Sequence, residues 1–296
     1  QRVQIDSSLS GRRRRILGCI TKSRAEEPCP LCESTTARHL GRSLFFCNCC
    51  RIAYNAGHRL PEYNDSYFLE EYRAQYGRTY LQDFDHIYAS SLRRLDSIFS
   101  LMGSGADPAR LSLADIGSAM GFFLKAASDR GFGNVSGIEI SRYAADYCRK
   151  EFGFEVENRA LMPDGVMSEH DVITAWFFIE HCSDPCGVIM DIAANVRPGG
   201  VFAFSVPSVF GPLYWFNRKE WVNTHPEDHR IDFSPGQLRL MMKMAGFRKT
   251  MIVPAGFHPE RVLPADSLFF DVFSALYRTA SGMLAFSDTL EVYALK

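Results

Sequence analysis

A short glycine-spaced loop constrains the fold of this chain more than any other feature. The apolar run Ser112–Ile116 is typical of a buried strand, and Asp115 stands near its end. Gly117 and Gly121 follow, and glycine allows a backbone to turn sharply and to approach a ligand closely. A helix expected over Phe122–Arg130 would present free N–H groups in its first turn. This strand, turn and helix predict a nucleotide-binding α/β unit.

A second acidic residue indicates which ligand the loop binds. Glu139 ends the next expected strand, 18 residues after Gly121, where a carboxylate suits a ribose diol. The spacing Asp-x-Gly-x-x-x-Gly differs from the Gly-x-Gly-x-x-Gly of dinucleotide sites. Asp115 would repel a pyrophosphate, but it could orient the loop and, through water, the ammonium group of an amino-acid moiety. The residues therefore favour S-adenosylmethionine (SAM) over NAD.

Residues 111–296 alternate short apolar runs with helical patterns, which predicts an α/β fold with a doubly wound, Rossmann-like, seven-stranded sheet. The expected strands are Ser112–Ile116, Val135–Ile140, Phe154–Glu157, Asp171–Trp176, Val201–Val206, Arg248–Val253 and Leu290–Leu295. Besides Phe122–Arg130, the expected helices are Arg142–Phe152, Pro185–Asn195 and Pro235–Ala245.

Four motifs in this region resemble those of class I SAM-dependent methyltransferases. The first motif of that family is matched by Asp115, Gly117 and Gly121, with Ala119 in place of its middle glycine. Glu139 matches the ribose-binding acid of the family. The other matches are the fourth-strand and Glu-His…Asp-Pro stretches over Asp171–Trp176 and Ile179–Pro185, and a Pro-Gly-Gly turn over Val196–Val201.

The resemblance implies which residues hold the cofactor. Leu161 falls where the family contacts adenine through a backbone amide, although the acid usual there is missing. Glu180 and His181 either brace a helix or take part in chemistry. The implied SAM-binding residues are Asp115, Gly117, Ser118, Ala119, Gly121, Glu139, Ile140, Leu161, Trp176 and Phe177.

Two CxxC pairs near the N-terminus predict a metal site. Cys29 with Cys32 and Cys47 with Cys50 can supply the four thiolates that structural Zn²⁺ prefers, which leaves no position open for a substrate. Iron or redox-active thiols are alternatives, and Cys49 could replace Cys50. A zinc knuckle followed by a Tyr-rich helical segment and a SAM domain resembles a group of bacterial methyltransferases. That group includes sugar C-methyltransferases and has ubiquinone-type O-methyltransferases as distant relatives.

Four segments are expected along the chain. Residues 1–27 form a disordered basic leader with the run Arg12–Arg15, residues 28–56 the zinc knuckle, and residues 57–105 a helical lid or linker. Residues 106–296 form the SAM-binding domain. In the third segment Tyr72, Tyr76 and Tyr80 recur every fourth residue, as either a packing stripe or a lid over SAM.

An insertion over residues 208–232, rich in aromatic residues and histidine, should cover the acceptor at the carboxyl ends of the strands. His225 and His229 are the candidate general bases, because an unperturbed histidine titrates near neutrality. Glu227 or Asp228 could orient one of them. The alternative is that residues 225–229 are only a turn that enters a helix.

Charge and hydropathy bear on two classes of function, nucleic-acid binding and membrane insertion. The 33 basic and 34 acidic residues give a net charge of −1, which argues against a nucleic-acid partner, and no run is apolar enough for a membrane span. We therefore expect a cytoplasmic methyltransferase, monomeric or homodimeric, that methylates an oxygen or carbon of a small-molecule acceptor. The alternatives are a non-catalytic zinc-containing binding module on a degenerate SAM fold and an RNA methyltransferase.

Overall fold

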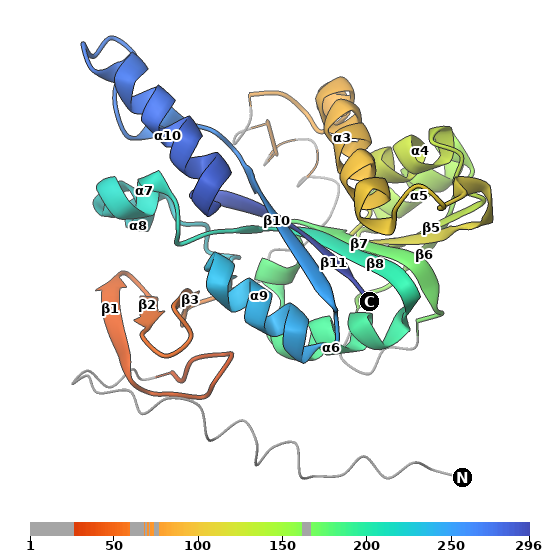
Figure 1. Ribbon diagram of the computed structural model, residues 1–296, viewed down its shortest axis with the longest axis horizontal. Helices are drawn as coiled ribbons and strands as arrows, with labels where there is room; N and C mark the ends of the chain where they lie inside the picture. The colour runs from red at the N-terminus through yellow and green to blue at the C-terminus, as the bar shows by residue number, and fades with distance from the viewer. Residues whose placement is uncertain (1–26, 60–67, 69, 71, 74–76, 162–166) are drawn as a thin grey trace.

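The computed structural model describes residues 27–59, 68, 70, 72–73, 77–161 and 167–296, and these form two sheets (Figure 1). Apart from Glu27, the leader predicted over residues 1–27 lies outside the described residues, as does Tyr76. None of the helices in the described ranges is both long and apolar enough to cross a lipid bilayer.

The larger sheet has seven strands and carries the glycine-spaced loop. In spatial order its strands are β10 (Lys249–Ala255), β11 (Thr289–Leu295), β8 (Val196–Pro207), β7 (His170–Trp176), β4 (Ser112–Ile116), β5 (Asn134–Glu139) and β6 (Glu155–Asn158). β11 runs antiparallel to both of its neighbours, and the other pairs are parallel. The strand order reverses between β4 and β7, and open α/β sheets bind their ligands outside such a switch point. The predicted α/β fold and its seven strands are confirmed.

Helices cover both faces of this sheet. Leu95 and Ile98 of α3 pack with residues of α4, α5 and the strands in one core cluster. α6 and α9 contribute Ile189 and Leu238 to a second cluster on the opposite face. Figure 1 shows the two layers on either side of the strands. The helices are α3 (Phe84–Met102), α4 (Phe122–Asp129), α5 (Arg142–Phe152), α6 (Pro185–Asn195) and α9 (Pro235–Met244).

The smaller sheet is built around the cysteine pairs. Its strands are β1 (Ala37–Gly41), β2 (Leu44–Cys47), β3 (Ile52–Asn55) and β9 (Ile231–Asp232), all antiparallel. The first three are local in sequence, but β9 comes from the insertion and pairs with β3, with Ala53 opposite Asp232 and Tyr54 opposite Ile231. The cysteine-rich segment and the α/β domain therefore share a sheet.

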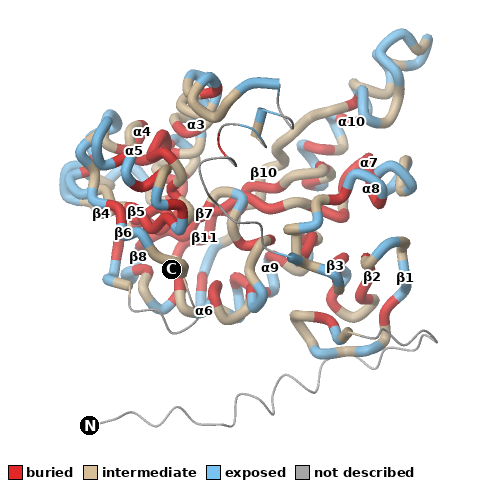
Figure 2. The backbone as a smooth tube through the Cα atoms, turned by 180° about the vertical axis from the view of Figure 1, so that it is seen from behind, coloured by how far each residue is buried: buried red, intermediate tan, exposed pale blue. Residues whose placement is uncertain are grey.

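Three parts of the fold differ from expectation. α10 (Phe270–Leu284), which projects from the molecule in Figure 1 and is mostly exposed in Figure 2, was not predicted. The insertion contains α7 (Pro212–Phe216) and α8 (Arg218–Thr224). β8 begins at Val196 instead of Val201, because the expected turn is a bulge within the strand. The register between β7 and β8 shifts there, since the pair His170–Val196 is followed by the pair Val172–Val201.

Four short 3-10 helices complete the described secondary structure: Leu81–Asp83, Pro108–Arg110, Ile179–His181 (η5) and Pro259–Arg261. Of the expected Tyr-rich segment, Tyr80 stacks on Phe122 at the start of α4, with ring centroids 5.2 Å apart. Tyr72 donates a hydrogen bond of 2.7 Å to Asp83. These contacts place the described part of the segment beside the glycine-spaced loop.

Candidate cofactor and acceptor site

The loop after β4 turns through three residues with positive φ. These are Gly117 at 69°, Ala119 at 46° and Gly121 at 82°. Gly117 donates a backbone hydrogen bond of 2.8 Å to Ile138, which ties the loop to β5. A Cβ at Gly121 would overlap the Cys148 sulfur, so this position requires glycine. Ala119 occupies the left-handed region, which explains why the related motif has glycine there.

Asp115 lies inside the sheet beneath this loop. It is 2% exposed and accepts a hydrogen bond of 2.6 Å from the Thr174 hydroxyl. Burial raises the pKa of Asp115 to about 7, although the Thr174 hydrogen bond and the nearby Arg94 both favour its ionised form. A cationic ligand beside the loop would stabilise the charge that burial disfavours.

Glu139 connects the loop to the end of β5. Its carboxylate accepts backbone hydrogen bonds from Ala119 at 2.8 Å and from Ser141 at 2.7 Å. Burial raises the pKa of Glu139, while these backbone donors oppose the shift. Ile140 follows with 53% of its surface exposed, and Leu161 is half-buried. Glu139 is therefore fixed at the switch point, with an exposed apolar side chain beside it.

The end of β7 brings aromatic side chains and a cation to the same edge. Phe177 has a φ of 54° and is 49% exposed, although it is not glycine. The Arg94 guanidinium lies 4.2 Å from the centre of the Trp176 ring and 5.8 Å from that of Phe177. Arg94 also pairs with buried Glu291 at 2.9 Å. Sequence reasoning missed Arg94, because only the fold brings α3 over the end of β7.

Of the predicted bases, His225 is held between two acceptors. Its Nε2 lies 2.6 Å from the Asp232 carboxylate and its Nδ1 lies 2.8 Å from the Pro226 carbonyl. Burial lowers the pKa of His225, but the Asp232 carboxylate outweighs burial and the net shift is upward. Both ring nitrogens face acceptors, and this arrangement favours the doubly protonated imidazolium.

His229 has the opposite character. Its ring lies 5.8 Å from that of His225 and 5.0 Å from that of His181. Its buried Nδ1 has no hydrogen-bond partner among the described residues. Burial and the neighbouring imidazoles hold the pKa of His229 well below its usual range. His229 is therefore a neutral imidazole, and its Nδ1 is buried without a partner among the described residues.

Glu180 in η5 faces the same cluster. It is fully buried, and neither carboxylate oxygen has a hydrogen-bond partner among the described residues. Burial raises the pKa of Glu180 well above its usual range, and Asp232 and Asp228 reinforce the shift. One carboxylate oxygen of Glu180 and one ring nitrogen each of His181 and His229 lie within 4.8 Å of one another. Acidic and basic groups thus meet beyond the end of β7.

The third predicted catalytic residue lies elsewhere. Glu227 is exposed and forms an ion pair of 3.1 Å with Arg42. Asp232 holds His225, while the Asp228 carboxylate lies 3.3 Å from His181. Asp232 was missed because it belongs to a two-residue strand whose partner is distant in sequence.

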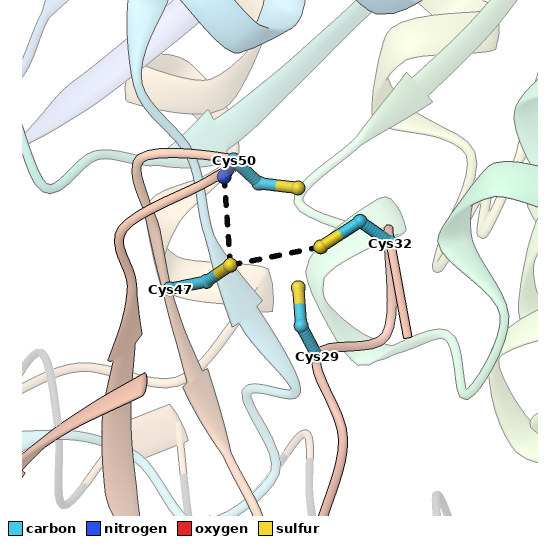
Figure 3. A group of neighbouring side chains, drawn as sticks. All are labelled: Cys29, Cys32, Cys47 and Cys50. Carbon is cyan, nitrogen blue, oxygen red and sulfur yellow. Dashed lines mark hydrogen bonds between the residues drawn. The ribbon is translucent and has the colours of Figure 1, made fainter. Parts of the chain in front are cut away.

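The four predicted metal ligands converge. Figure 3 shows the sulfurs of Cys29, Cys32, Cys47 and Cys50 directed toward a common centre, and all four lie within 4.8 Å of one another. The residues directly after the two pairs, Glu33 and Arg51, both have a φ of 58°. Two matching turns thus present four thiols in the arrangement of a closed tetrahedral site.

Cys49 lies outside this group, with its sulfur 4.0 Å from the Ser34 hydroxyl. The main chain also contributes to the cluster, since the Cys50 backbone N–H donates to the Cys47 sulfur at 3.4 Å. The structure therefore selects Cys50, and not Cys49, as the fourth member.

Comparison with curated proteins identifies distant relatives. A ubiquinone biosynthesis O-methyltransferase from Bordetella avium is 28% identical over 204 residues, which cover 63% of this chain and 79% of the relative. The enzyme of the same name from Ralstonia nicotianae is 30% identical over 196 residues, which cover 61% of this chain and 75% of the relative.

Solved structures share the fold. A SAM-dependent methyltransferase from Archaeoglobus fulgidus aligns with a TM-score of 0.55 at 17% identity, over 78% of this chain and all of the other. A possible histamine N-methyltransferase from Thermotoga maritima aligns at 0.53 and 16% identity, over 78% and 98% of the two chains. The family model described as "Methyltransferase domain" matches residues 84–251, more than half of the chain. The chain therefore belongs to this methyltransferase family and is a class I SAM-dependent methyltransferase (EC 2.1.1).

Proposed function

We propose that this enzyme transfers the methyl group of SAM to an oxygen or carbon of a small-molecule acceptor at the cluster beyond β7. The curated relatives are named O-methyltransferases, which supports an oxygen. The observation that carries the proposal is the neutral His229, whose unpartnered Nδ1 lies in the cluster that follows the cofactor strand.

In this proposal the loop and strand ends hold the cofactor. Asp115 faces the ammonium group of the methionine moiety through the loop, and Glu139 accepts from the ribose hydroxyls. Gly117, Ser118, Ala119 and Gly121 form the wall against which the methionine moiety lies. The exposed Ile140 and Phe177 flank the ligand together with Leu161 and Trp176, with adenine nearest Ile140 and Leu161. Residues 162–166, which follow Leu161, lie outside the described residues.

The reaction is a direct displacement. An acceptor oxygen forms a bond to the methyl carbon while the sulfonium–carbon bond breaks, and S-adenosylhomocysteine leaves. The acceptor hydroxyl proton passes to the free nitrogen of His229. His225, both of whose ring nitrogens face acceptors, contacts Asp232 and the Pro226 carbonyl instead of taking a proton. Glu227 has no part in proton transfer, because it pairs with Arg42.

We further propose that the four-cysteine cluster binds a structural Zn²⁺. Its support is the convergence of four thiols, in two matching turns, on one point. Zinc there would supply folding energy to a sheet whose first three strands are only four or five residues long. A cytoplasmic location, and a monomeric or homodimeric state, stay predictions from the sequence.

The test compares His229→Gln and His225→Gln with the exposed His258→Gln as a matched control. Acceptors are screened first, as a panel of phenols, catechols and sugar nucleotides scored by S-adenosylhomocysteine formation. His229→Gln should lower kcat by ~100-fold or more, with the affinity for SAM unchanged, because general bases contribute 10²–10⁴-fold. Full turnover by His229→Gln would refute the role of His229.

An RNA acceptor is the remaining alternative. A gel shift with structured RNA that weakens steeply as salt rises would support it over a small molecule. Family membership supports an enzyme over the non-catalytic zinc-containing module. Failure of the chain to bind SAM at millimolar concentration would count against both hypotheses, methyl transfer to a small molecule and methyl transfer to RNA.

A further inference from the structure

The cysteine-rich sheet contacts the candidate acceptor site directly. β9, its fourth strand, carries Asp232, whose carboxylate lies 2.6 Å from His225. β9 has only two residues and pairs with β3, while the residues on either side of it, Arg230 and Phe233, donate backbone hydrogen bonds to Glu180 and Pro207 of the larger domain. The small sheet and the larger domain therefore position Asp232 together.

Arg42, in the turn between β1 and β2, holds the other end of the segment that carries His225. Its guanidinium donates to the backbone carbonyls of Val222, Asn223 and His225 at 3.2, 3.3 and 3.0 Å. Val222 and Asn223 belong to the last turn of α8, where carbonyls lack intrahelical partners. A basic side chain that binds such carbonyls fixes the end of a helix. Arg42 thus fixes the point at which the chain leaves α8 and enters His225.

The middle of the segment is tied to the same sheet. Asn55, at the end of β3, donates from its side chain to the Glu227 carbonyl at 3.2 Å, and its backbone N–H donates to Arg230 at 3.0 Å. The Arg230 guanidinium returns a hydrogen bond of 2.6 Å to the Asn55 carbonyl. Residues 222–232 are therefore held by the small sheet at both ends and in the middle.

We propose that the cysteine-rich sheet is a working part of the acceptor site, with Arg42 as a positioning residue that holds His225 against Asp232. The inference rests on the proposed function of the histidine cluster. It differs from a purely structural role of the sheet, because loss of the Arg42 contacts displaces the histidine while SAM binding is retained. A displacement of about 1 Å near reacting groups can lower a rate by ~100-fold.

The test uses full-length Arg42→Ala and Arg42→Lys, with Arg38→Ala as the matched control. Arg38 lies in the same hairpin and reaches the insertion through the Tyr214 hydroxyl at 3.5 Å, but it does not contact residues 222–227 among its described hydrogen bonds. Bound zinc, thermal unfolding and SAM affinity establish that each variant is folded. Arg42→Lys keeps the positive charge but lacks the planar guanidinium donors. It therefore distinguishes an effect of the hydrogen bonds that position His225 from an effect of the charge.

The deciding readout is the pKa of the His225 ring, followed by NMR of ¹⁵N-labelled histidine. Among the described residues, Asp232, Arg42 and His229 are the charged or titratable groups next to this ring, and Glu180 lies beyond them beside His229. Removal of the Arg42 charge alone would raise the pKa of His225, because Arg42 disfavours a second cation nearby. Loss of the Asp232 contact would lower it. We expect a lower pKa and a kcat reduced ~10–100-fold in Arg42→Ala, with Arg42→Lys in between and Arg38→Ala unchanged.

A raised or unchanged pKa of His225 in folded Arg42→Ala would overturn the positioning role. Failure of the proposed function is seen separately. If His229→Gln and His225→Gln both keep full turnover, the histidines are not catalytic, yet the ring signals of Arg42→Ala still report whether Arg42 holds His225.

Discussion

Thr174 donates a hydrogen bond of 2.6 Å to Asp115, and the two residues lie opposite each other on the parallel strands β7 and β4. This hydroxyl is the one side-chain donor to Asp115 among the described contacts, and burial raises the pKa of the carboxyl to about 7. The unliganded enzyme therefore holds Asp115 partly protonated at neutral pH. In the proposed binding mode the ammonium group of SAM lies near the loop, so SAM should favour the ionised form.

The affinity for SAM should consequently rise with pH. Between about pH 5.5 and about pH 7.0 the fraction of free enzyme with ionised Asp115 rises to about half, so binding has to displace a proton from fewer molecules. The dissociation constant measured by calorimetry should fall by roughly tenfold over this interval, which lies below the titration range of an α-amino group near 8. An affinity that is flat across the interval would contradict the role given to Asp115.

Asp115→Asn is the matched control for this effect. The amide has nearly the shape of the protonated carboxyl but cannot ionise, so SAM binding should be weaker and less dependent on pH. The pKa of Glu139 is also raised, so ionisation of its carboxyl changes the affinity for SAM in the same direction. This contribution to the pH dependence should persist in Asp115→Asn. A pH dependence equal to that of the wild type would assign the whole effect to Glu139.

Ala119→Gly should leave the protein as stable or make it more stable. Ala119 has a φ of 46°, and the left-handed region costs a non-glycine residue about 1–2 kcal/mol. Glycine loses ~0.4–1 kcal/mol of this relief through the greater freedom of the unfolded chain, so the net change should be a gain of about 0–1.5 kcal/mol. Chemical denaturation measures it.

The exposed Ala89 in the middle of α3 provides the contrast. Ala89→Gly should lose ~1 kcal/mol, because glycine is a poor helix former and no strain is relieved there. If both variants lose stability equally, the φ of Ala119 carries no strain, and the departure from the family motif has another reason.

Local signals made much of the SAM domain predictable. The bounds of α5 and α6 match the sequence prediction, because Ser141 and Asp184 cap their first turns through side-chain hydrogen bonds and Gly153 ends α5 in the left-handed conformation. The cofactor loop was predictable for the same reason, since its glycines and acids are close in sequence.

The parts that were missed depend on contacts far apart in sequence. β9 is two residues long and exists because β3 pairs with it. α10 has no capping side chain to mark its start, and although apolar residues recur in it at helical spacing, it buries only Tyr277 and Ser281 and leaves Val272, Leu276 and Met283 exposed. The pairing of His225 with Asp232, instead of Glu227, follows from the β9 strand and could not be read from spacing.

The cysteine cluster should hold about one equivalent of zinc per chain, measured by elemental analysis. Cys47→Ser should lose the metal, because three thiolates leave the tetrahedral set open. Cys49→Ser, which changes the neighbouring thiol outside the cluster, should keep it. Equal zinc content in both variants would mean that Cys47 is not a ligand.

Gly121→Ala should abolish SAM binding and destabilise the fold. The new methyl group would overlap the Cys148 sulfur, and the residue would also keep a φ of 82°. Overpacking costs typically 1–3 kcal/mol, and the left-handed backbone adds about 1–2 kcal/mol. Removal of the sulfur in Gly121→Ala/Cys148→Ala relieves the first cost but not the second, so Gly121→Ala should cost less stability in the Cys148→Ala background than in the wild type. If the effects of the two substitutions on the free energy of unfolding simply add, the side chain at position 121 does not contact Cys148. The need for glycine in this turn would then have another cause.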